Sequence, residues 1–255
     1  MPPDWIDLDG VVNMRDVGGL PTSGGGSVAS GVLIRSDNLQ ELTPGSVDRL
    51  IGDLGVTDIV DLRTESEVHV EGDGPLRRVR SLVHHHHSLF RSEAVTSTDR
   101  TLPWHDSNVD RTTTQFWGEH YLGYLRGRPD SISAALGVLA GASGATIVHC
   151  AAGKDRTGTV VGLALDVAGV PHEAIIADYL ASGERIEAIM TRLLSRPAYA
   201  EHLASHTVAE QVPVPQAMEA ILTYAADEFG GAAGWLQSVG WTQTQVARLR
   251  ERLRG

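Results

Sequence analysis

The amino-acid sequence predicts an α/β protein with a central, mostly parallel β-sheet flanked by helices, extra helices at the C-terminal end and a lid-like insertion. Strand–helix–strand order between residues 31 and 83 favours a parallel sheet. An apolar run at 145–149 leads directly into a helical segment. From about residue 171 onward, apolar residues recur at helical spacing. A chain of 255 residues is expected to form one domain, 1–255.

The first third of the chain contains short strands and one well-marked helix. Ser23–Gly26 is rich in glycine and is expected to form a hairpin tip. Residues 31–35 are apolar enough for a strand. Thr43 and Pro44 mark the start of a helix that should end near Gly55. The further strands that we expect cover 56–62 and 77–83.

The middle of the chain begins with a long polar stretch. Residues 88–114 show no periodicity, and a connection of this length is often functional, so we expect a long loop or lid there. The lid-like insertion and its helices are assigned to 88–140, and the wholly helical C-terminal part to 171–255. The segments expected in these parts are helices over 115–126, 131–140, 157–167, 174–180, 186–194 and 217–229, a strand over 145–149, and a last helix opened by a capping box of Thr242 and Gln245.

Composition restricts the classes of function. The net charge of −11 repels nucleic acid and anionic lipid at long range, so an anionic substrate needs a local cationic pocket. No stretch approaches the ~18 apolar residues of a membrane span, and residues 1–9 are acidic and lack a signal region. We therefore expect a soluble protein without stable membrane insertion, cytoplasmic or exported without a cleaved signal peptide.

Residues 149–158, His-Cys-Ala-Ala-Gly-Lys-Asp-Arg-Thr-Gly, contain the expected chemistry. A short loop between a strand and a helix N-terminus binds anions, because its backbone N–H groups have no helical partners and the helix dipole adds positive charge. Cys150 is the single cysteine of the chain and opens this loop. Such surroundings favour a thiolate over a thiol. Arg156 is placed to bind an anion bidentately, and Gly153 allows the loop to curl.

This segment resembles the signature of protein tyrosine phosphatases, Cys-x5-Arg followed by Ser or Thr. Its Gly-Lys-Asp-Arg-Thr version is similar to the atypical, mycobacterial-type branch of bacterial tyrosine and lipid phosphatases. The resemblance spans roughly residues 9–254 and implies a tyrosine phosphatase-like fold. The other segments that resemble this branch are Asn13–Gly19, Leu33–Asp37, Ile59–Arg63 and Asp178–Leu180.

The resemblance implies a role for each signature residue. Cys150 is expected to be the nucleophile and Arg156 the phosphate clamp, while Thr157 hydrogen-bonds the sulfur. Substrate binding is expected from the loop residues Ala151, Ala152, Gly153 and Lys154. His149 should brace the loop from a buried position, and Asn13–Gly19 should pack under it.

The general acid has more than one candidate. Asp155 lies inside the signature, where the branch places an acid, and we favour it. Asp61 ends a strand and is expected to be a supporting carboxylate, although an ion pair with Arg63 is an alternative. Asp106 is a third candidate on the possible lid.

Two further features allow a functional and a structural interpretation. Lys154 is expected on the loop rim, where it could reach a second phosphate, or it could be a solvated lysine. His84–His87 could bind metal, but successive strand residues alternate faces, so at most two histidines share one. We therefore expect no metal site and no cofactor.

Three functions fit these patterns. The first is a phosphomonoesterase with a phosphocysteine intermediate, acting on phosphotyrosine and also on phosphoserine, phosphothreonine or phosphoinositides. The second is a rhodanese-like sulfurtransferase, against which the Arg156–Thr157 pair argues. The third is an inactive phosphate-binding module. The expected partner is thus a phosphorylated protein or phosphoinositide substrate, not nucleic acid.

Overall fold

A six-stranded, mostly parallel sheet forms the centre of the computed structural model, which describes residues 2–91 and 114–255. The strand order is β1-β2-β3-β6-β4-β5. Strands β3, β6, β4 and β5 run parallel, and β1 and β2 continue the sheet antiparallel beyond β3. The mostly parallel sheet expected from the sequence is confirmed. The strands are β1 (Asp4–Trp5), β2 (Arg15–Asp16), β3 (Leu33–Ser36), β4 (Val56–Asp61), β5 (Val83–His86) and β6 (Ala145–His149).

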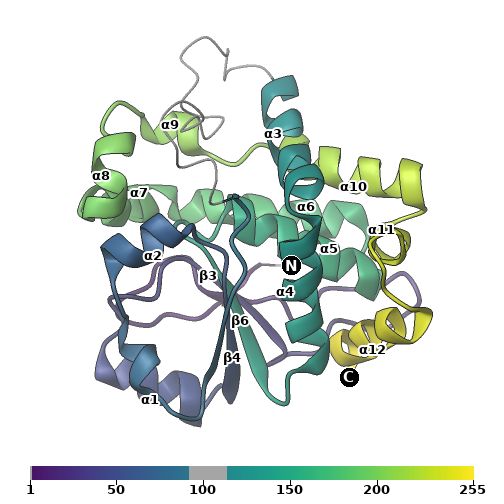
Figure 1. Cartoon of the computed structure of the whole chain (residues 1–255), viewed down its shortest axis with the longest axis horizontal. Coiled ribbons are helices and arrows are strands. Elements are labelled where there is room, and N and C mark those ends of the chain that lie inside the picture. The colour runs from purple at the N-terminus through teal and green to yellow at the C-terminus, as the bar shows by residue number, and fades with distance from the viewer. Residues whose placement is uncertain (1, 92–113) are drawn as a thin grey trace.

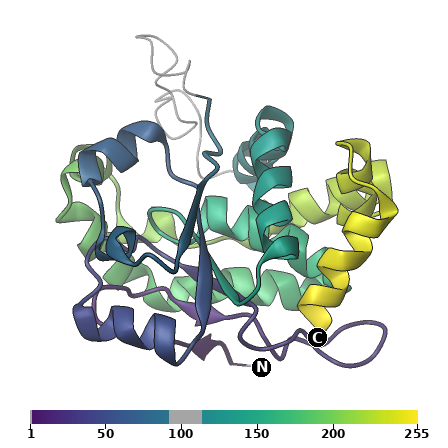
Figure 2. The same cartoon turned by 60° about the horizontal axis from the view of Figure 1, so that its bottom comes forward.

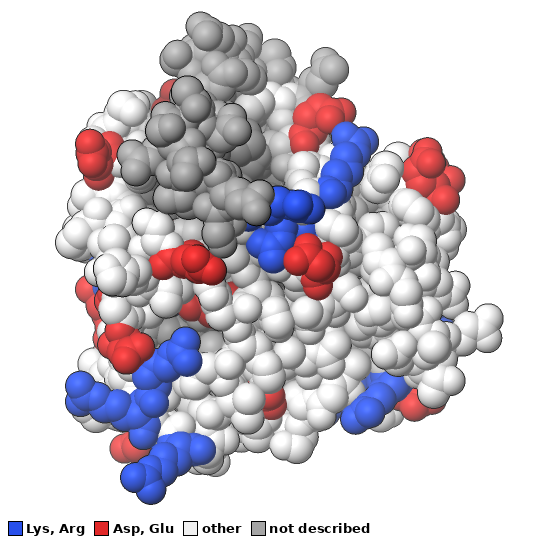
Figure 3. Space-filling model, in the orientation of Figure 1, with Lys and Arg blue, Asp and Glu red and all other residues white. Residues whose placement is uncertain are grey.

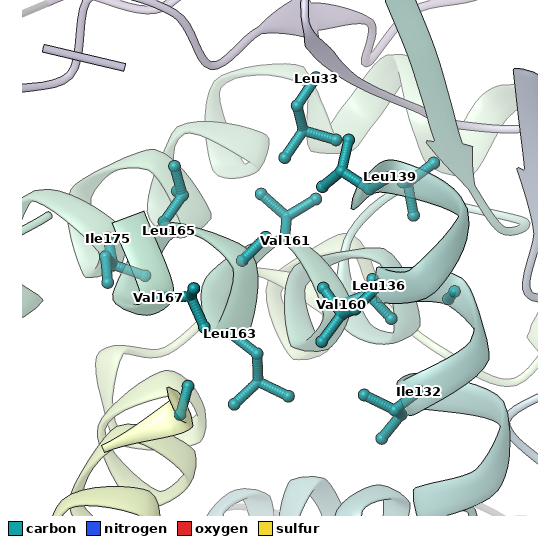
Figure 4. Close-up of a cluster of buried hydrophobic side chains, with 14 of the residues drawn as sticks. Leu33, Ile132, Leu136, Leu139, Val160, Val161, Leu163, Leu165, Val167 and Ile175 are labelled. Atoms are coloured by element: carbon teal, nitrogen blue, oxygen red, sulfur yellow. The ribbon is translucent and has the colours of Figure 1, made fainter. Parts of the chain in front are cut away.

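Helices cover both faces of this sheet, as Figures 1 and 2 show. On one face Leu50 of α1 packs with Ile34, Ile59 and Ile147 of the strands. On the other face a larger core is built from α4 and α5 (Figure 4). The helices from α1 to α5 and the 3₁₀ helix η1 are α1 (Pro44–Gly52), α2 (Glu65–Glu71), η1 (Pro75–Arg78), α3 (Thr114–Gly127), α4 (Pro129–Gly141) and α5 (Asp155–Ala168).

The C-terminal part is helical, as expected. Helix α10 packs against α3, and α12 packs against α4 and α5. No helix in the described ranges is both long and apolar enough to cross a membrane. These elements are α6 (His172–Ala181), the 3₁₀ helix η4 (Ser182–Arg185), α7 (Ile186–Leu194), α8 (Pro197–Leu203), α9 (Val208–Gln211), α10 (Pro215–Phe229), α11 (Ala232–Ser238) and α12 (Gln243–Arg254).

Local signals placed several boundaries correctly. The Thr43 hydroxyl accepts a hydrogen bond from the Ser46 N–H and caps α1, as the sequence predicts. Thr242 and Gln245 form the expected capping box of α12. The expected hairpin tip is also confirmed, because Pro21 pairs with Ser27 around the glycine-rich turn. Caps and tight turns depend on a few adjacent residues, so the sequence alone is sufficient to find them.

The prediction of a strand over 77–83 is wrong. Pro75–Arg78 forms a 3₁₀ helix, and β5 begins only at Val83 and continues through the histidines. Leu76 and Leu82 are both buried against the α1 face of the sheet, so this segment folds over the core instead of extending along it. Helix α2 follows the Thr64–Glu67 capping box and was not predicted. Most of the expected loop at 88–114, including Asp106, lies outside the described residues.

Candidate active site

The signature loop lies at the carboxyl end of β6, a central strand with β3 on one side and β4 on the other. Cys150 directly follows β6 and is only 2 % exposed. Five residues after Cys150, α5 begins at Asp155, so the loop passes straight into a helix N-terminus. Ligands of open α/β sheets bind at this edge, and the orphan N–H groups of α5 favour an anion.

The carbonyl groups of this loop point outward to donors on other segments. A peptide group directs its C=O and its N–H to opposite sides. The N–H groups of Ala152, Gly153 and Lys154 therefore turn toward the inside of the loop, as a phosphate cradle requires. The outward hydrogen bonds run from the Asn38 N–H to the Ala151 oxygen (3.0 Å), from Asn13 Nδ2 to the Ala152 oxygen (2.9 Å) and from Arg35 Nη2 to the Gly153 oxygen (3.0 Å).

Gly153 is required by the shape of the loop. Its φ angle is +67°, a conformation that side chains strongly disfavour. A Cβ atom there would also lie 2.5 Å from the Ser36 carbonyl group. The loop can therefore approach β3 closely only with glycine at this position.

One of these donors, Arg35, is itself held by Asp178 of α6, and the same carboxylate holds Arg15, which donates to the Asn13 side chain. Arg15 Nε lies 2.8 Å from one oxygen of this carboxylate, and Arg35 Nη1 lies 2.5 Å from the other. Burial by itself would raise the pKa of Asp178, but the two arginines outweigh it and lower the pKa. The packing expected of Asn13–Gly19 under the loop is confirmed at Asn13, whose side chain bonds the Ala152 oxygen and is itself held by Arg15.

Arg156 forms a two-point ion pair with Glu67 of α2. Its Nη1 lies 2.6 Å from Oε2 and its Nη2 lies 2.9 Å from Oε1, and Nη1 also donates to the Leu62 carbonyl oxygen (3.4 Å). A guanidinium carries five N–H groups. These contacts leave Nε–H and one N–H of Nη2, which share an edge and can bind two oxygens of a phosphate.

Asp155 contacts a tyrosine and a lysine. The Tyr121 hydroxyl donates to Asp155 Oδ1 (2.5 Å), and the Tyr179 hydroxyl lies 2.8 Å from that of Tyr121. The Lys154 ammonium is 3.6 Å from the same Oδ1. The Asp155 side chain is 22 % exposed, so this carboxylate at the first turn of α5 can reach a substrate.

Asp61 forms a buried ion pair with Arg63. This ion pair is the alternative that the sequence left open beside a supporting role in catalysis. Arg63 Nη2 lies 2.6 Å from Asp61 Oδ2, and Arg63 Nε lies 2.9 Å from Oδ1. Burial alone would raise the pKa of Asp61, but His149 and Arg63 outweigh it and hold the pKa well below its usual range. A carboxyl group held ionised in this way has no proton to donate at neutral pH.

His149 is buried and touches the loop. Its Nδ1 lies 3.3 Å from the Cys150 carbonyl oxygen, which confirms the expected bracing contact. Burial lowers the pKa of His149 to about 4, so the ring is neutral at pH 7.

Two signature side chains differ from expectation. Lys154 is not on an exposed rim: it is 3 % exposed, donates to the Gln211 carbonyl oxygen of α9 (2.6 Å) and lies over the Trp117 ring. The side chain points under α9 because this carbonyl group and this ring satisfy its charge. The Thr157 hydroxyl is buried and has no hydrogen-bond partner in the described structure, so the expected bond to the sulfur is not formed. An unpaired buried hydroxyl beside the loop is available to a ligand.

The histidines of β5 serve separate partners. His84 contacts the Leu76 carbonyl oxygen, His85 contacts Asp58 (2.8 Å) and His86 contacts the Arg63 carbonyl oxygen. Among the described residues, no group of three or more metal-ligating side chains could hold a metal ion.

Sequence reasoning missed the partners of the loop. Glu67 had a local signal, since Thr64 and Glu67 form a capping box immediately after β4. Arg35 and Asp178 lie in two of the segments that resemble the phosphatase branch, but the sequence did not indicate that they support the loop. Tyr121 had no signal that distinguishes it from an apolar residue of an amphipathic helix.

The comparisons with known proteins agree with this geometry. The model of a family described as "Tyrosine phosphatase family" matches residues 6–255. The chain is 28 % identical over 242 residues to a tyrosine-protein phosphatase of Nostoc commune, covering 89 % of this chain and 76 % of that protein. It is 27 % identical over 281 aligned positions to the triple specificity protein phosphatase PtpB of Mycobacterium tuberculosis, covering 98 % and 99 %. A putative tyrosine-protein phosphatase of Cupriavidus necator is 31 % identical over 198 residues, covering 76 % and 68 %.

Proposed function

The chain belongs to the tyrosine phosphatase family, and from this premise we propose that it hydrolyses phosphotyrosine through a phosphocysteine formed on Cys150. Arg156 and the loop amides hold the phosphoryl group, and Asp155 is the general acid. The range of substrates extends to phosphoserine, phosphothreonine and phosphoinositides. The name of the mycobacterial relative, a triple specificity phosphatase, supports this breadth.

The first step transfers the phosphoryl group to the enzyme. The Cys150 thiolate attacks phosphorus, the bond from phosphorus to the leaving oxygen breaks, and that oxygen takes a proton from Asp155. The inward N–H groups of Ala152, Gly153 and Lys154 and the free edge of Arg156 face the oxygens on which negative charge is held. Lys154 thus binds substrate through its backbone, while its ammonium stays with Gln211.

The second step releases phosphate. A water molecule attacks the phosphocysteine, Asp155 accepts its proton, and the sulfur leaves as thiolate. The Thr157 hydroxyl, which is buried without a partner in the described structure, is suited to donate to the departing sulfur. Splitting hydrolysis into two displacements lowers the barrier of a very slow reaction.

The observation that carries this proposal is the orientation of Arg156. Glu67 and the Leu62 carbonyl group occupy three of its N–H groups, and no other described residue bonds the remaining edge. A site that forms a persulfide does not need an arginine oriented to bind a phosphate dianion, so a sulfurtransferase is not favoured. An inactive module is not favoured either, since nucleophile, clamp and acid are all retained.

Replacing the nucleophile tests the proposal. We expect Cys150→Ser to lose turnover of p-nitrophenyl phosphate and of a phosphotyrosine peptide while still binding vanadate. The wild type should show no sulfur transfer from thiosulfate to cyanide. Turnover of the serine variant within about tenfold of the wild type would contradict the assignment of Cys150.

A further inference from the structure

A chain of buried hydroxyl groups ends at the proposed general acid. Tyr121 of α3 is fully buried and bonds Asp155 Oδ1 at 2.5 Å. Tyr179 of α6, also buried, bonds the Tyr121 hydroxyl at 2.8 Å. Two helices outside the signature, α3 and α6, thus extend a chain of hydroxyl groups to one carboxylate oxygen.

The direction of these bonds follows from the groups at the ends. An ionised carboxylate only accepts hydrogen bonds, so the single proton of the Tyr121 hydroxyl is donated to Asp155. Tyr121 can then only accept from Tyr179. Burial, followed by the charge of Asp155, raises the pKa of Tyr121 well above its usual value, so the hydroxyl stays protonated and keeps this direction.

The two oxygens of Asp155 are therefore not equivalent. Oδ1 takes the Tyr121 bond and lies near the Lys154 ammonium. Oδ2 has no hydrogen bond from any residue that the structure describes. When the carboxyl group is protonated, its proton accordingly lies on Oδ2, the oxygen that remains available to a leaving group.

We propose that Tyr121 is a positioning residue for Asp155, held in place by Tyr179, and that it both orients the acid and stabilises the carboxylate formed by proton transfer. This role rests on the proposed function, in which Asp155 gives a proton to the leaving oxygen. As Oδ2 loses that proton, negative charge grows on the carboxylate and strengthens the bond from Tyr121.

Other groups around Asp155 do not replace this effect. Burial lowers the pKa of His120 to about 4, so its ring is neutral when the acid works. Burial also raises the pKa of Tyr124 and Tyr179, so both remain protonated. The titratable and charged groups that face Asp155 are Lys154 and Arg156 from the loop and α5, His120, Tyr121 and Tyr124 from α3, and Tyr179 from α6.

The test is the pH profile of Tyr121→Phe with two leaving groups. We expect the alkaline limb of kcat/KM to move up by about one pH unit, because the carboxylate loses one charge-assisted hydrogen bond. Turnover of an alkyl phosphate should fall about tenfold, and that of p-nitrophenyl phosphate about twofold or less, since only the poor leaving group needs the proton. Tyr124→Phe is the matched control. It also removes a buried hydroxyl from α3, but that hydroxyl bonds His120 and not Asp155. Its alkaline limb should stay in place.

Further variants distinguish a failure of the role proposed for Tyr121 from a failure of Asp155 as the general acid. Tyr179→Phe should move the limb in the same direction by less, and Tyr121→Phe should add nothing in an Asp155→Asn background. A folded Tyr121→Phe protein with an unmoved limb and equal losses on both substrates would overturn the role of Tyr121. If Tyr121→Phe does not fold, an unmoved limb in Tyr179→Phe overturns it. An alkaline limb that survives in Asp155→Asn is a different result and overturns the proposed acid itself.

Discussion

Arg156 is buried and Glu67 is partly buried, and each is the other's counter-charge. Burial alone would raise the pKa of Glu67, but Arg156 outweighs it and lowers the pKa, so the glutamate stays ionised. Glu67 Oε2 also accepts from the Thr64 N–H, which closes the capping box of α2. One carboxylate therefore both starts a helix and orients the clamp.

We predict that Glu67→Gln lowers kcat/KM by about tenfold to a hundredfold. This is the loss in rate that corresponds to the free energy of one hydrogen bond between charged groups. The amide has one acceptor oxygen where the carboxylate has two, so it cannot form the two-point pair with Arg156 and the guanidinium loses its fixed orientation. Steady-state kinetics on p-nitrophenyl phosphate measures the effect. Glu65→Gln, an exposed position on the same helix, is the control and should match the wild type. Unchanged kinetics in a folded Glu67→Gln protein would contradict the role of Glu67.

The Asp61–Arg63 pair should act on stability. Asp61→Asn leaves the Arg63 charge buried without its partner, and breaking such a pair costs about 3–5 kcal/mol. The folded-state pKa of Asp61 lies below its ordinary value of 3.8. The contribution of the ionised Asp61 to the free energy of unfolding is therefore complete above pH 3.8. It is lost as the pH falls through the lower pKa that Asp61 has in the folded state.

Urea unfolding at several pH values checks this prediction. The difference in unfolding free energy between wild type and Asp61→Asn should be largest near pH 7 and should narrow below about pH 4. Asp53→Asn, in an exposed pair with Arg49, should change little at any pH. A difference that stays constant down to pH 2 would show that charge is not the cause.

At the scale of elements, α7 and α8 pack against each other (Figure 1). Ile189, Met190 and Tyr199 pack with Ala151 of the loop. Arg192 binds Asp37, Glu41 and the Asn38 carbonyl oxygen, and Arg196 binds Glu41 and Glu71. An apolar contact and an ionic network thus connect these helices to the segment after β3 and to α2.

Removing Arg192 should loosen these helices selectively. We expect Arg192→Ala to speed amide hydrogen exchange in α7 and α8 by about tenfold, because three polar contacts are lost at once. Exchange in α5 should not change. Arg185→Ala removes an exposed contact with Asp7 and is the control. Equal exchange in α7 and α8 of wild type and Arg192→Ala would show that the apolar contact is sufficient.

At the scale of the whole molecule, the net charge affects how an anionic substrate is bound, and the cysteine content affects how the protein responds to oxidants. Acidic and basic side chains are interspersed on the face shown in Figure 3, and the net charge of the chain is −11. In the proposed function, the positive charge that binds phosphate therefore comes from the site itself, from Arg156 and from the N-terminal end of the α5 dipole. The chain has one cysteine, so an oxidised Cys150 has no second thiol with which to form an intramolecular disulfide.

We therefore predict inactivation by peroxide without a protective disulfide. Micromolar peroxide should inactivate the enzyme, and dithiothreitol should restore it after brief exposure. On long exposure, mass spectrometry should find sulfinic and sulfonic acid at Cys150, with loss that dithiothreitol does not reverse. Cys150→Ser is the control for oxidation at methionine. A Cys150 that resists both peroxide and iodoacetate at pH 6 would indicate an inert structural thiol.

Much of the fold could be predicted because its signals are local. The strand at 145–149, the caps of α1 and α12 and the helical C-terminal part each depend on residues that are near one another in sequence. The wrong strand at 77–83 shows the limit. Its composition suits a strand, but burial of Leu76 and Leu82 against the core decides the path of the chain.

The sequence by itself determined where the proposed reaction site lies, since the proposed nucleophile, acid and clamp and the turn glycine occupy residues 150–156 and the cradle needs only a strand, a loop and a helix N-terminus. The tertiary structure alone decided what holds them. Glu67 reaches Arg156 across 89 residues, Arg35 reaches Gly153 across 118, and Tyr121 reaches Asp155 across 34. The physical reason is that backbone geometry acts over a few residues, whereas a buried charge is satisfied by whichever group the packing brings to it. For the same reason Lys154, exposed by expectation, lies buried beneath Gln211.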